Sequence, residues 1–345
     1  MEDIKAEQQL VFLQKMQRLL DEGSFTSTYK YALILSLVDI AVESPRKATS
    51  TLDVSVRYIA EKFIQIYWRQ AVDFPSVSGD IGELYQNSAS QAAVINKINQ
   101  AYLSCNGQLT FLKKDVKRYQ NLMSDVAKIV RDMPLRRLQT AGSQVDEFLY
   151  SNDSEPSQIT LLPGVAYCLR QFHAQLTAMT KNAWVSWIRR AKNNQKILGQ
   201  STDLADFLFG SERNSLGKYV PLLENIQKGK CFYCNSQLHG SSEVDHFIPW
   251  SRYPVDYGHN FVLAHKGCNG SKGNMLAAEY HLKAWCSRNQ IFEHILNSYF
   301  DEHGLTHNLH ASNSIANWAY QQAKIAGSQL WLSKGETCHF SSLQE

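Results

Sequence analysis

The sequence lacks any apolar run long enough to cross a bilayer. Among its 345 residues, the longest candidate, 31–42, is interrupted by Ser36 and Asp39 and is shorter than the roughly 20 residues that a transmembrane helix needs. The first ten residues, MEDIKAEQQL, are acidic and polar, without the basic and apolar regions of a secretory signal. These absences predict a protein with no membrane partner.

Cysteine and net charge are also low. The seven cysteines, an odd number with one tight pair, fit a reducing compartment better than a disulfide scaffold, so we expect the cytoplasm. A net charge of +3 leaves nucleic-acid binding open, because such binding depends on where the basic residues lie. The apolar content of 44% and the charged content of 19% describe a folded globular protein. The length predicts two domains.

Apolar residues recur at helical spacing through most of the first 200 residues. Prolines and glycines separate these runs, and no repeat of fixed period is visible. The spacing predicts helices over 8–20, 28–42, 54–68, 92–103, 113–133 and 165–192. Two short apolar runs, 147–150 and 159–162, predict a β-hairpin. We therefore expect a helical N-terminal domain, 1–200, that binds DNA, dimerises or regulates.

Basic residues gather where the last of these helices is expected to end. Trp184 and Trp187 lie three residues apart, hence on one helical face, and Arg189, Arg190 and Lys192 follow them. This pattern predicts a DNA-binding surface that contacts phosphates. It is more typical of tryptophans that pack between domains, with cations favoured at a helix C-terminus by the helix dipole.

Two short pairs of metal-binding residues bracket the stretch 231–275: Cys231-x2-Cys234 and His265-x2-Cys268. Thiolates and imidazoles at this spacing can reach one ion, and four of them complete a tetrahedral structural zinc site. His239 is a rival fourth ligand, although a residue of a closely spaced pair chelates more naturally. The sequence predicts a Cys3His zinc site, and the other four cysteines are expected to be ordinary thiols.

An acid, an imidazole and an amide lie in the same stretch, and zinc needs none of them. Asp245 and His246 are adjacent, so on an extended strand they point in opposite directions and can have separate duties. Asn269 follows the last zinc ligand directly. Phosphodiester hydrolysis requires an activated water and compensation of charge on the phosphate. An imidazole can accept a proton from water near neutral pH, and carboxylate and amide oxygens suit Mg²⁺ or Mn²⁺.

In order and spacing these elements resemble the HNH, or ββα-metal, nuclease family. The shared pattern is a C-x2-C pair, an Asp-His-x-x-Pro, an Asn, and a second zinc pair followed by Asn and Lys. It corresponds here to 231–234, 245–249, Asn260 and 265–272. Many members have a second C-x2-C where this chain has His265. A Cys3His site is an ordinary zinc composition, so the site should survive the change.

The resemblance implies a small zinc-braced ββα domain and a metal-dependent DNA endonuclease that leaves 5′-phosphate and 3′-hydroxyl ends. It implies that Asp245 and Asn269 bind the catalytic ion, that His246 is the general base, and that Asn260 holds the loop that positions the base. Lys272, three residues after Asn269, is expected to face the same side of a helix and to meet a phosphate. One such module cuts one strand, so nicking suits a monomer, and duplex cleavage calls for a homodimer or two successive events.

Each of these residues alone has a commoner structural explanation, such as a turn for an Asn-Gly pair. Their combination inside a zinc site favours catalysis. Two alternatives stay open: a zinc-stabilised nucleic-acid-binding or scaffold protein with an idle nuclease centre, and an HNH enzyme that cleaves RNA. An idle centre tends to lose its base or a metal ligand, and here all are present. Nothing resembles a base-stacking RNA module.

The N-terminal half, through segments such as TYKYAL (28–33), also resembles the region that precedes HNH modules in bacterial restriction and antiphage-defence proteins, soluble nucleases of Zorya-type systems among them. This resemblance implies a role in defence, with other components of such a system as partners. The expected fold class is mainly α. A helical domain precedes an HNH nuclease domain, 201–345, whose core motif is 231–275 and whose C-terminal helices cover 276–298 and 315–326.

Overall fold

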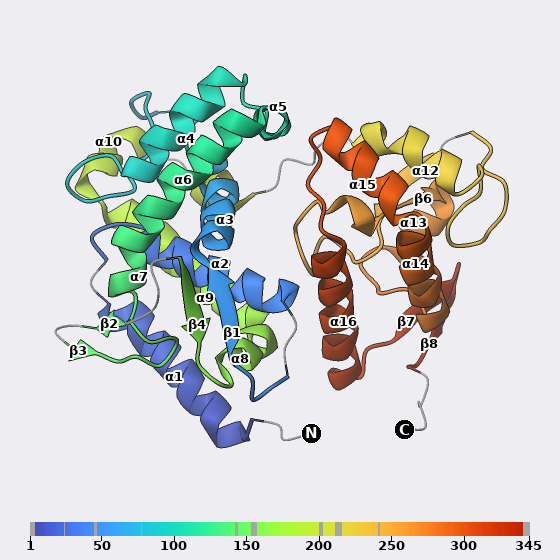
Figure 1. The fold of residues 1–345 in the computed structure, drawn as a ribbon, viewed down its shortest axis with the longest axis horizontal. Coiled ribbons are helices and arrows are strands. Elements are labelled where there is room, and N and C mark those ends of the chain that lie inside the picture. Colours follow the sequence, from blue (N-terminus) through green and yellow to red (C-terminus); the bar gives the residue numbers. More distant parts are fainter. Residues whose placement is uncertain are drawn as a thin grey trace. The chain divides into compact units, whose positions relative to one another are not determined.

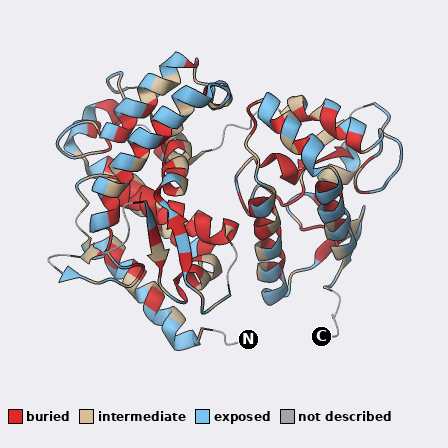
Figure 2. Ribbon diagram, in the orientation of Figure 1, coloured by how far each residue is buried: buried red, intermediate tan, exposed pale blue. Residues whose placement is uncertain are grey.

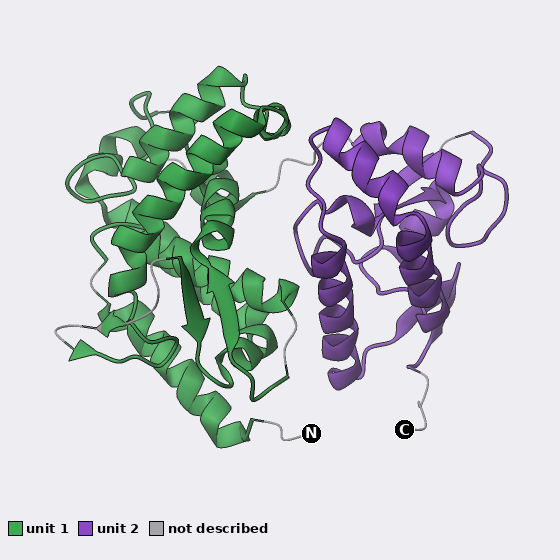
Figure 3. Cartoon of the chain, in the orientation of Figure 1, with its two compact units in different colours: residues 1–210 green, residues 211–345 purple. Residues whose placement is uncertain are grey.

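The chain divides into two compact units, residues 1–210 and 211–345 (Figure 3). The computed structural model describes residues 4–23, 25–44, 47–76, 78–141, 144–152, 157–199, 203–210, 216–240 and 242–340. Helices dominate both units and the sheets are small (Figure 1). The predicted mainly-α class is therefore confirmed. The division falls ten residues after the boundary expected at residue 200.

The first unit is a helical domain with one hydrophobic core. Its helices are α1 (Ala6–Glu22), α2 (Tyr29–Glu43), α3 (Val56–Trp68), α4 (Ala93–Ser104), α5 (Leu109–Lys114), α6 (Val116–Asp132), α7 (Pro134–Arg137), α8 (Val165–Gln171), α9 (His173–Arg190), η1 (Lys192–Asn194), α10 (Gln195–Leu198) and α11 (Leu204–Phe209). Helix α2 is the centre of this unit, because every residue of it except Asp39 is buried (Figure 2). It contacts α3, α7, α8 and α9. A helix with apolar residues on every side requires such an enclosed position.

Two of the predicted helices are divided. The expected helix 113–133 is interrupted at Asp115, whose side chain accepts a hydrogen bond of 3.1 Å from the backbone N–H of Arg118 and so caps α6. The expected helix 165–192 is interrupted at Phe172, where the backbone leaves helical geometry between α8 and α9. Helix α6 ends at Asp132, as Pro134 predicts.

The predicted β-hairpin is only partly formed, because one antiparallel bridge and one backbone hydrogen bond, from the N–H of Leu162 to the carbonyl oxygen of Leu149, join its two segments. Strand β4 (Gln158–Leu161) pairs antiparallel with β1 (Leu52–Ser55), about a hundred residues earlier, and Tyr150 makes only an isolated bridge to Leu161. Burial alternates along β1, so the apolar side chains of both strands enter the core of the unit. This long-range burial outweighs the local pairing that sequence separation favours. Part of the expected connection, 153–156, lies outside the described residues.

The second unit is built around two strands and a helix. Strand β5 (Ser242–His246) pairs antiparallel with β6 (Phe261–His265), and α13 (Lys266–Lys272) contacts both strands. The segment η3 (Gly258–Asn260) leads into β6, while η2 (Leu216–Tyr219) and α12 (Val220–Ile226) precede the strands. This ββα arrangement is the one implied by the predicted family resemblance.

The C-terminal helices cover the ββα element. They are α14 (Glu279–Ile291), α15 (Glu293–Glu302) and α16 (Leu309–Ile325), followed by a hairpin of β7 (Leu330–Ser333) and β8 (Glu336–Cys338). The expected helix 276–298 is divided at Phe292. Trp285 of α14 stacks on Phe247 at a ring-centroid distance of 5.2 Å. No helix in the described part of the chain has both the length and the apolarity needed to cross a membrane.

Candidate metal centre and active site

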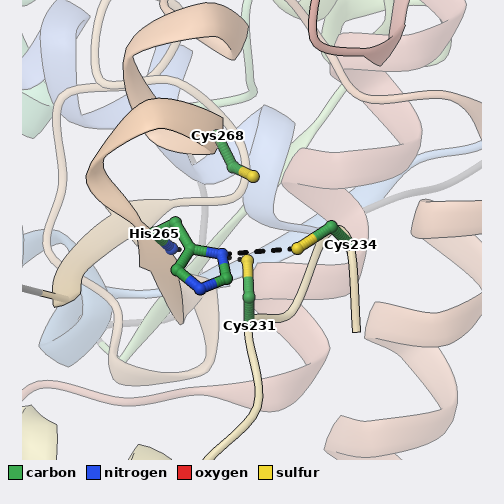
Figure 4. Close-up of side chains that lie close together, drawn as sticks. All are labelled: Cys231, Cys234, His265 and Cys268. Carbon is green, nitrogen blue, oxygen red and sulfur yellow. Dashed lines mark hydrogen bonds between the residues drawn. The ribbon is translucent and has the colours of Figure 1, made fainter. Parts of the chain in front are cut away.

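The four predicted zinc ligands come together. Cys231 and Cys234 lie in the turn before β5, His265 ends β6, and Cys268 lies in the first turns of α13. Their ligand atoms all lie within 4.8 Å of one another (Figure 4). The rival ligand His239 is exposed and lies outside this cluster. Two segments that are distant in sequence, the turn before β5 and the junction of β6 with α13, therefore share one potential ion.

Hydrogen bonds orient the histidine of this cluster. His265 Nδ1 lies 3.3 Å from Cys234 Sγ, and Nε2 lies 3.1 Å from the carbonyl oxygen of Gln237. A proton on Nε2 donated to Gln237 leaves Nδ1 as the ligand atom, which is the usual way in which an outer partner fixes the tautomer of a metal-binding histidine. The backbone N–H of His265 also donates to Cys231 Sγ at 3.4 Å.

The thiols of the cluster lie close enough to influence one another's ionisation. Burial and the sulfurs of Cys231 and Cys234 raise the pKa of Cys268 to about 12. Burial also acts against ionisation of Cys234, but hydrogen bonds from Ser236 outweigh it and bring the pKa of Cys234 to about 7. A divalent cation would neutralise this group of thiolates. A Cys3His donor set at this separation fits a structural zinc ion.

The acid, imidazole and amide predicted for catalysis share one pocket. Asp245 and His246 at the end of β5 and Asn269 of α13 line a cavity of about 410 Å³. The remaining lining residues include Trp250, Asp256 and Asn274. The pocket lies entirely within the second unit, beside the Cys3His cluster.

One oxygen of Asp245 has two donors. The Tyr233 hydroxyl donates to Asp245 Oδ2 at 2.5 Å, and Lys272 Nζ lies 2.9 Å from the same oxygen. Lys272 is only 1% exposed and also donates to the carbonyl oxygen of His246 at 3.0 Å. Lys272 is thus placed beneath the pocket, which differs from the exposed position expected for a side chain that meets a phosphate.

His246 is paired with a carboxylate that the motif does not contain. His246 Nε2 lies 2.8 Å from Asp256 Oδ1, and the imidazole packs edge-on against Trp250 and Phe261. With Nε2–H donated to Asp256, Nδ1 is the nitrogen that can accept a proton. Asp256 lies in the long connection between β5 and β6, and its only sequence signal is that it is a carboxylate in that loop.

Two asparagines have different partners. Asn269 Nδ2 donates a hydrogen bond to Glu243 Oε2 at 2.9 Å. The amide oxygen of Asn269 is then the atom that can act as a ligand for a cation. Asn260 is buried and clamps Ile248, because its Oδ1 accepts from the backbone N–H at 2.8 Å and its Nδ2 donates to the carbonyl at 3.0 Å. Asn260 thereby holds the backbone just after His246. Glu243 was not predicted from the sequence.

The surroundings of His259 indicate a structural role. It is fully buried, and burial together with nearby His307 and Arg288 lowers the pKa of His259 to about 3. Its carbonyl oxygen accepts hydrogen bonds from Trp285, Arg288 and Asn289. These contacts fix the backbone next to Asn260.

The basic residues predicted to bind DNA lie in the first unit. Arg189 and Arg190 end α9, Lys192 begins η1, and all three are exposed. Trp184 is buried and its Nε1–H donates to Gln86, while that of Trp187 donates to the carbonyl oxygen of Phe25. The tryptophans therefore pack within the unit, and the cations remain at its surface.

The fold and the pocket of the second unit define the class of domain to which this unit belongs. A zinc-compatible ββα element with an Asp-His pair and an Asn in one cavity is the architecture of an HNH nuclease domain, and the family model of the HNH endonuclease matches residues 231–278. The model of a domain of unknown function, DUF8808, matches residues 10–208, and the chain belongs to that family. No curated protein and no solved structure is significantly similar to the chain.

Proposed function

We propose that the protein is a metal-dependent DNA endonuclease that hydrolyses phosphodiester bonds. The observation that carries this proposal is the shared pocket of Asp245, His246 and Asn269 within a ββα element. The HNH endonuclease match over the same residues supports a nuclease in general. An idle centre would be expected to have lost one of these three groups.

His246 acts as the general base in this proposal. Donation of Nε2–H to Asp256 keeps the other ring nitrogen free to take a proton from water. Asp256 also compensates the positive charge that the imidazole acquires when it takes that proton. Asn260 and Lys272 position the base. Asn260 accepts a hydrogen bond from the backbone N–H of Ile248, two residues after His246, and Lys272 donates to the carbonyl oxygen of His246 itself. They would influence the rate without touching the phosphate.

Asp245 and Asn269 are the proposed ligands of a catalytic Mg²⁺ or Mn²⁺. Each offers a hard oxygen to the pocket, and most of the coordination shell is left to water and substrate, which suits these ions. Such an ion, when bound, supplies positive charge for the phosphate and for the leaving oxygen. The structural zinc is assigned separately to Cys231, Cys234, His265 and Cys268.

Arg189, Arg190 and Lys192 are the proposed DNA-binding residues of the first unit. Their exposure and positive charge suit phosphate contacts. We propose DNA rather than RNA as the substrate on the family resemblance, and a homodimer as one route to duplex cleavage. Restriction or antiphage defence in the cytoplasm, with other components of such a system as partners, is proposed on the resemblance of the helical half.

The direct test is cleavage of a supercoiled plasmid with Mg²⁺ or Mn²⁺ by the wild-type protein and by His246→Ala. Removing the base should lower the nicking rate by roughly 100-fold or more. His239→Ala, an exposed histidine outside both sites, is the matched control and should cut like the wild type. Equal rates for all three proteins would refute the role of His246. If the wild-type protein cleaves an RNA substrate under the same conditions but leaves the plasmid intact, the RNA alternative is favoured.

A further inference from the structure

Tyr233 joins the zinc cluster to the pocket. It lies between Cys231 and Cys234 in the sequence and is 6% exposed. Its hydroxyl donates to Asp245 Oδ2 at 2.5 Å. The turn that supplies two of the zinc ligands therefore also holds the carboxylate proposed to bind the catalytic ion.

The second donor to that carboxylate comes from the other half of the zinc cluster. Lys272 ends α13, and the same helix carries Cys268. Its Nζ lies 2.9 Å from Asp245 Oδ2 and 5.9 Å from the centroid of the Tyr233 ring. Both donors meet on Oδ2, so the other oxygen of Asp245 is the one available to a cation.

The Tyr233 ring is fixed on its other sides by aromatic contacts. It packs edge-on against His281 at 5.3 Å and against Trp331 at 5.1 Å, measured between ring centroids. Trp331 in turn donates to Ser271 Oγ of α13 at 3.0 Å. Because the ring is enclosed, a displacement of the Cys231–Cys234 turn would move the hydroxyl away from Asp245.

We propose that Tyr233 is a positioning residue that couples the zinc site to the catalytic metal site. It holds Asp245 so that a single oxygen is offered to the catalytic ion, and an ordered zinc cluster keeps Tyr233 in place. Occupancy of the two metal sites is then linked, and the linkage is reciprocal. This inference rests on the proposed nuclease function, because it assumes that Asp245 is a metal ligand.

The test compares Mn²⁺ affinity, measured by electron paramagnetic resonance on zinc-loaded protein, among wild type, Tyr233→Phe and Tyr320→Phe. Tyr320 is the matched control, because it is another buried tyrosine of the same unit and its hydroxyl donates at 2.6 Å to a backbone carbonyl, that of Ala277. Tyr233→Phe keeps the ring and should keep its zinc, but its Mn²⁺ affinity should fall roughly tenfold, because the carboxylate of Asp245 is no longer held with one oxygen toward the ion. Tyr320→Phe should bind Mn²⁺ like the wild type.

A zinc-loaded Tyr233→Phe protein that binds Mn²⁺ as tightly as the wild type would overturn the coupling. Asp245→Ala separates this failure from failure of the proposed function, since it should abolish Mn²⁺ binding in the pocket. If Asp245→Ala binds Mn²⁺ normally, the assignment of the pocket and the coupling both fail. Wild-type protein with and without zinc supplies a second test should Tyr233→Phe lose its zinc: the linkage requires weaker Mn²⁺ binding by the zinc-free protein, and equal affinity would overturn the coupling.

Discussion

His246 and Asp256 form the residue pair on which the proposed chemistry depends most. The 2.8 Å contact fixes the direction of the imidazole and selects which ring nitrogen can accept a proton. Both side chains are partly exposed, at 18% and 20%, so they face the pocket without being isolated from water. A carboxylate in this position reduces the freedom of the imidazole to rotate.

Asp256→Asn should lower the cleavage rate by roughly 10- to 100-fold without changing the fold, because the amide no longer compensates an imidazolium. Single-turnover cleavage at saturating Mg²⁺ measures the effect. Asp301→Asn is the matched control, since Asp301 accepts from His307 Nε2 at 3.0 Å on the exposed surface of the same unit. Wild-type cleavage by Asp256→Asn would show that the pair is only structural.

At the residue scale, the Cys3His cluster and the grouping of Asp245, His246 and Asn269 were predictable from the sequence because each set is part of a compact motif. Cys231-x2-Cys234 and His265-x2-Cys268 carry their geometry in their spacing. Tyr233, Glu243 and Asp256 were not predicted, because their roles come from tertiary contacts that no fixed spacing encodes. The burial of Lys272 was missed for the same reason: helical spacing gives the face of a residue but not what covers it.

At the scale of elements, the zinc cluster ties together the turn before β5, the end of β6 and the start of α13. The ladder between β5 and β6 spans only five residue pairs, from Ser242↔His265 to His246↔Phe261. So short a ladder is marginal by itself. A zinc ion bound there would therefore contribute to folding as well as to geometry, since its binding energy would be realised only in the folded arrangement.

Chelation of zinc, or Cys268→Ser, should lower the melting temperature of the second unit by roughly 10 °C or more and leave that of the first unit unchanged. Differential scanning calorimetry with and without a chelator measures both transitions. Cys286→Ser, an exposed cysteine outside the cluster, is the control and should melt like the wild type. An unchanged second-unit transition in the chelated protein would show that zinc is not structural here.

Also at the scale of elements, the sequence did not reveal where two predicted helices are divided or which strand pairs with β4. Apolar periodicity continues through Phe172 and Phe292, so it could not reveal that the backbone turns there. The pairing of β4 with β1 was likewise hidden, because a strand's partner is chosen by the core that both strands enter rather than by their separation in sequence. The ββα element was predictable because its zinc ligands mark the ends of its parts.

At the scale of the whole molecule, positive charge is concentrated in one part of the chain. Residues 157–202 contain six basic residues, Arg170, Lys181, Arg189, Arg190, Lys192 and Lys196, and no acidic residue. The remaining chain then has 35 − 6 = 29 basic and 32 acidic residues, so it carries a net charge of −3. The overall value of +3 thus conceals a segment of +6. Four of the six cations follow within eight residues at the end of α9 and beyond, where all four are exposed.

Reversing Arg189, Arg190 and Lys192 together to glutamate should therefore weaken DNA binding. We expect an affinity loss of roughly 10- to 1,000-fold and a slope of log K against log salt that is shallower by about one for each lost phosphate contact. Fluorescence anisotropy at several salt concentrations with a labelled duplex measures both quantities.

The control reverses Lys283, Lys324 and Lys334, which are exposed in the second unit, and likewise takes the net charge from +3 to −3. If the two triple variants lose affinity equally, general repulsion is responsible and the end of α9 is not a binding surface. If only the first loses affinity while its unfolding transition stays that of the wild type, the helical unit contributes DNA contacts that are separate from the nuclease pocket.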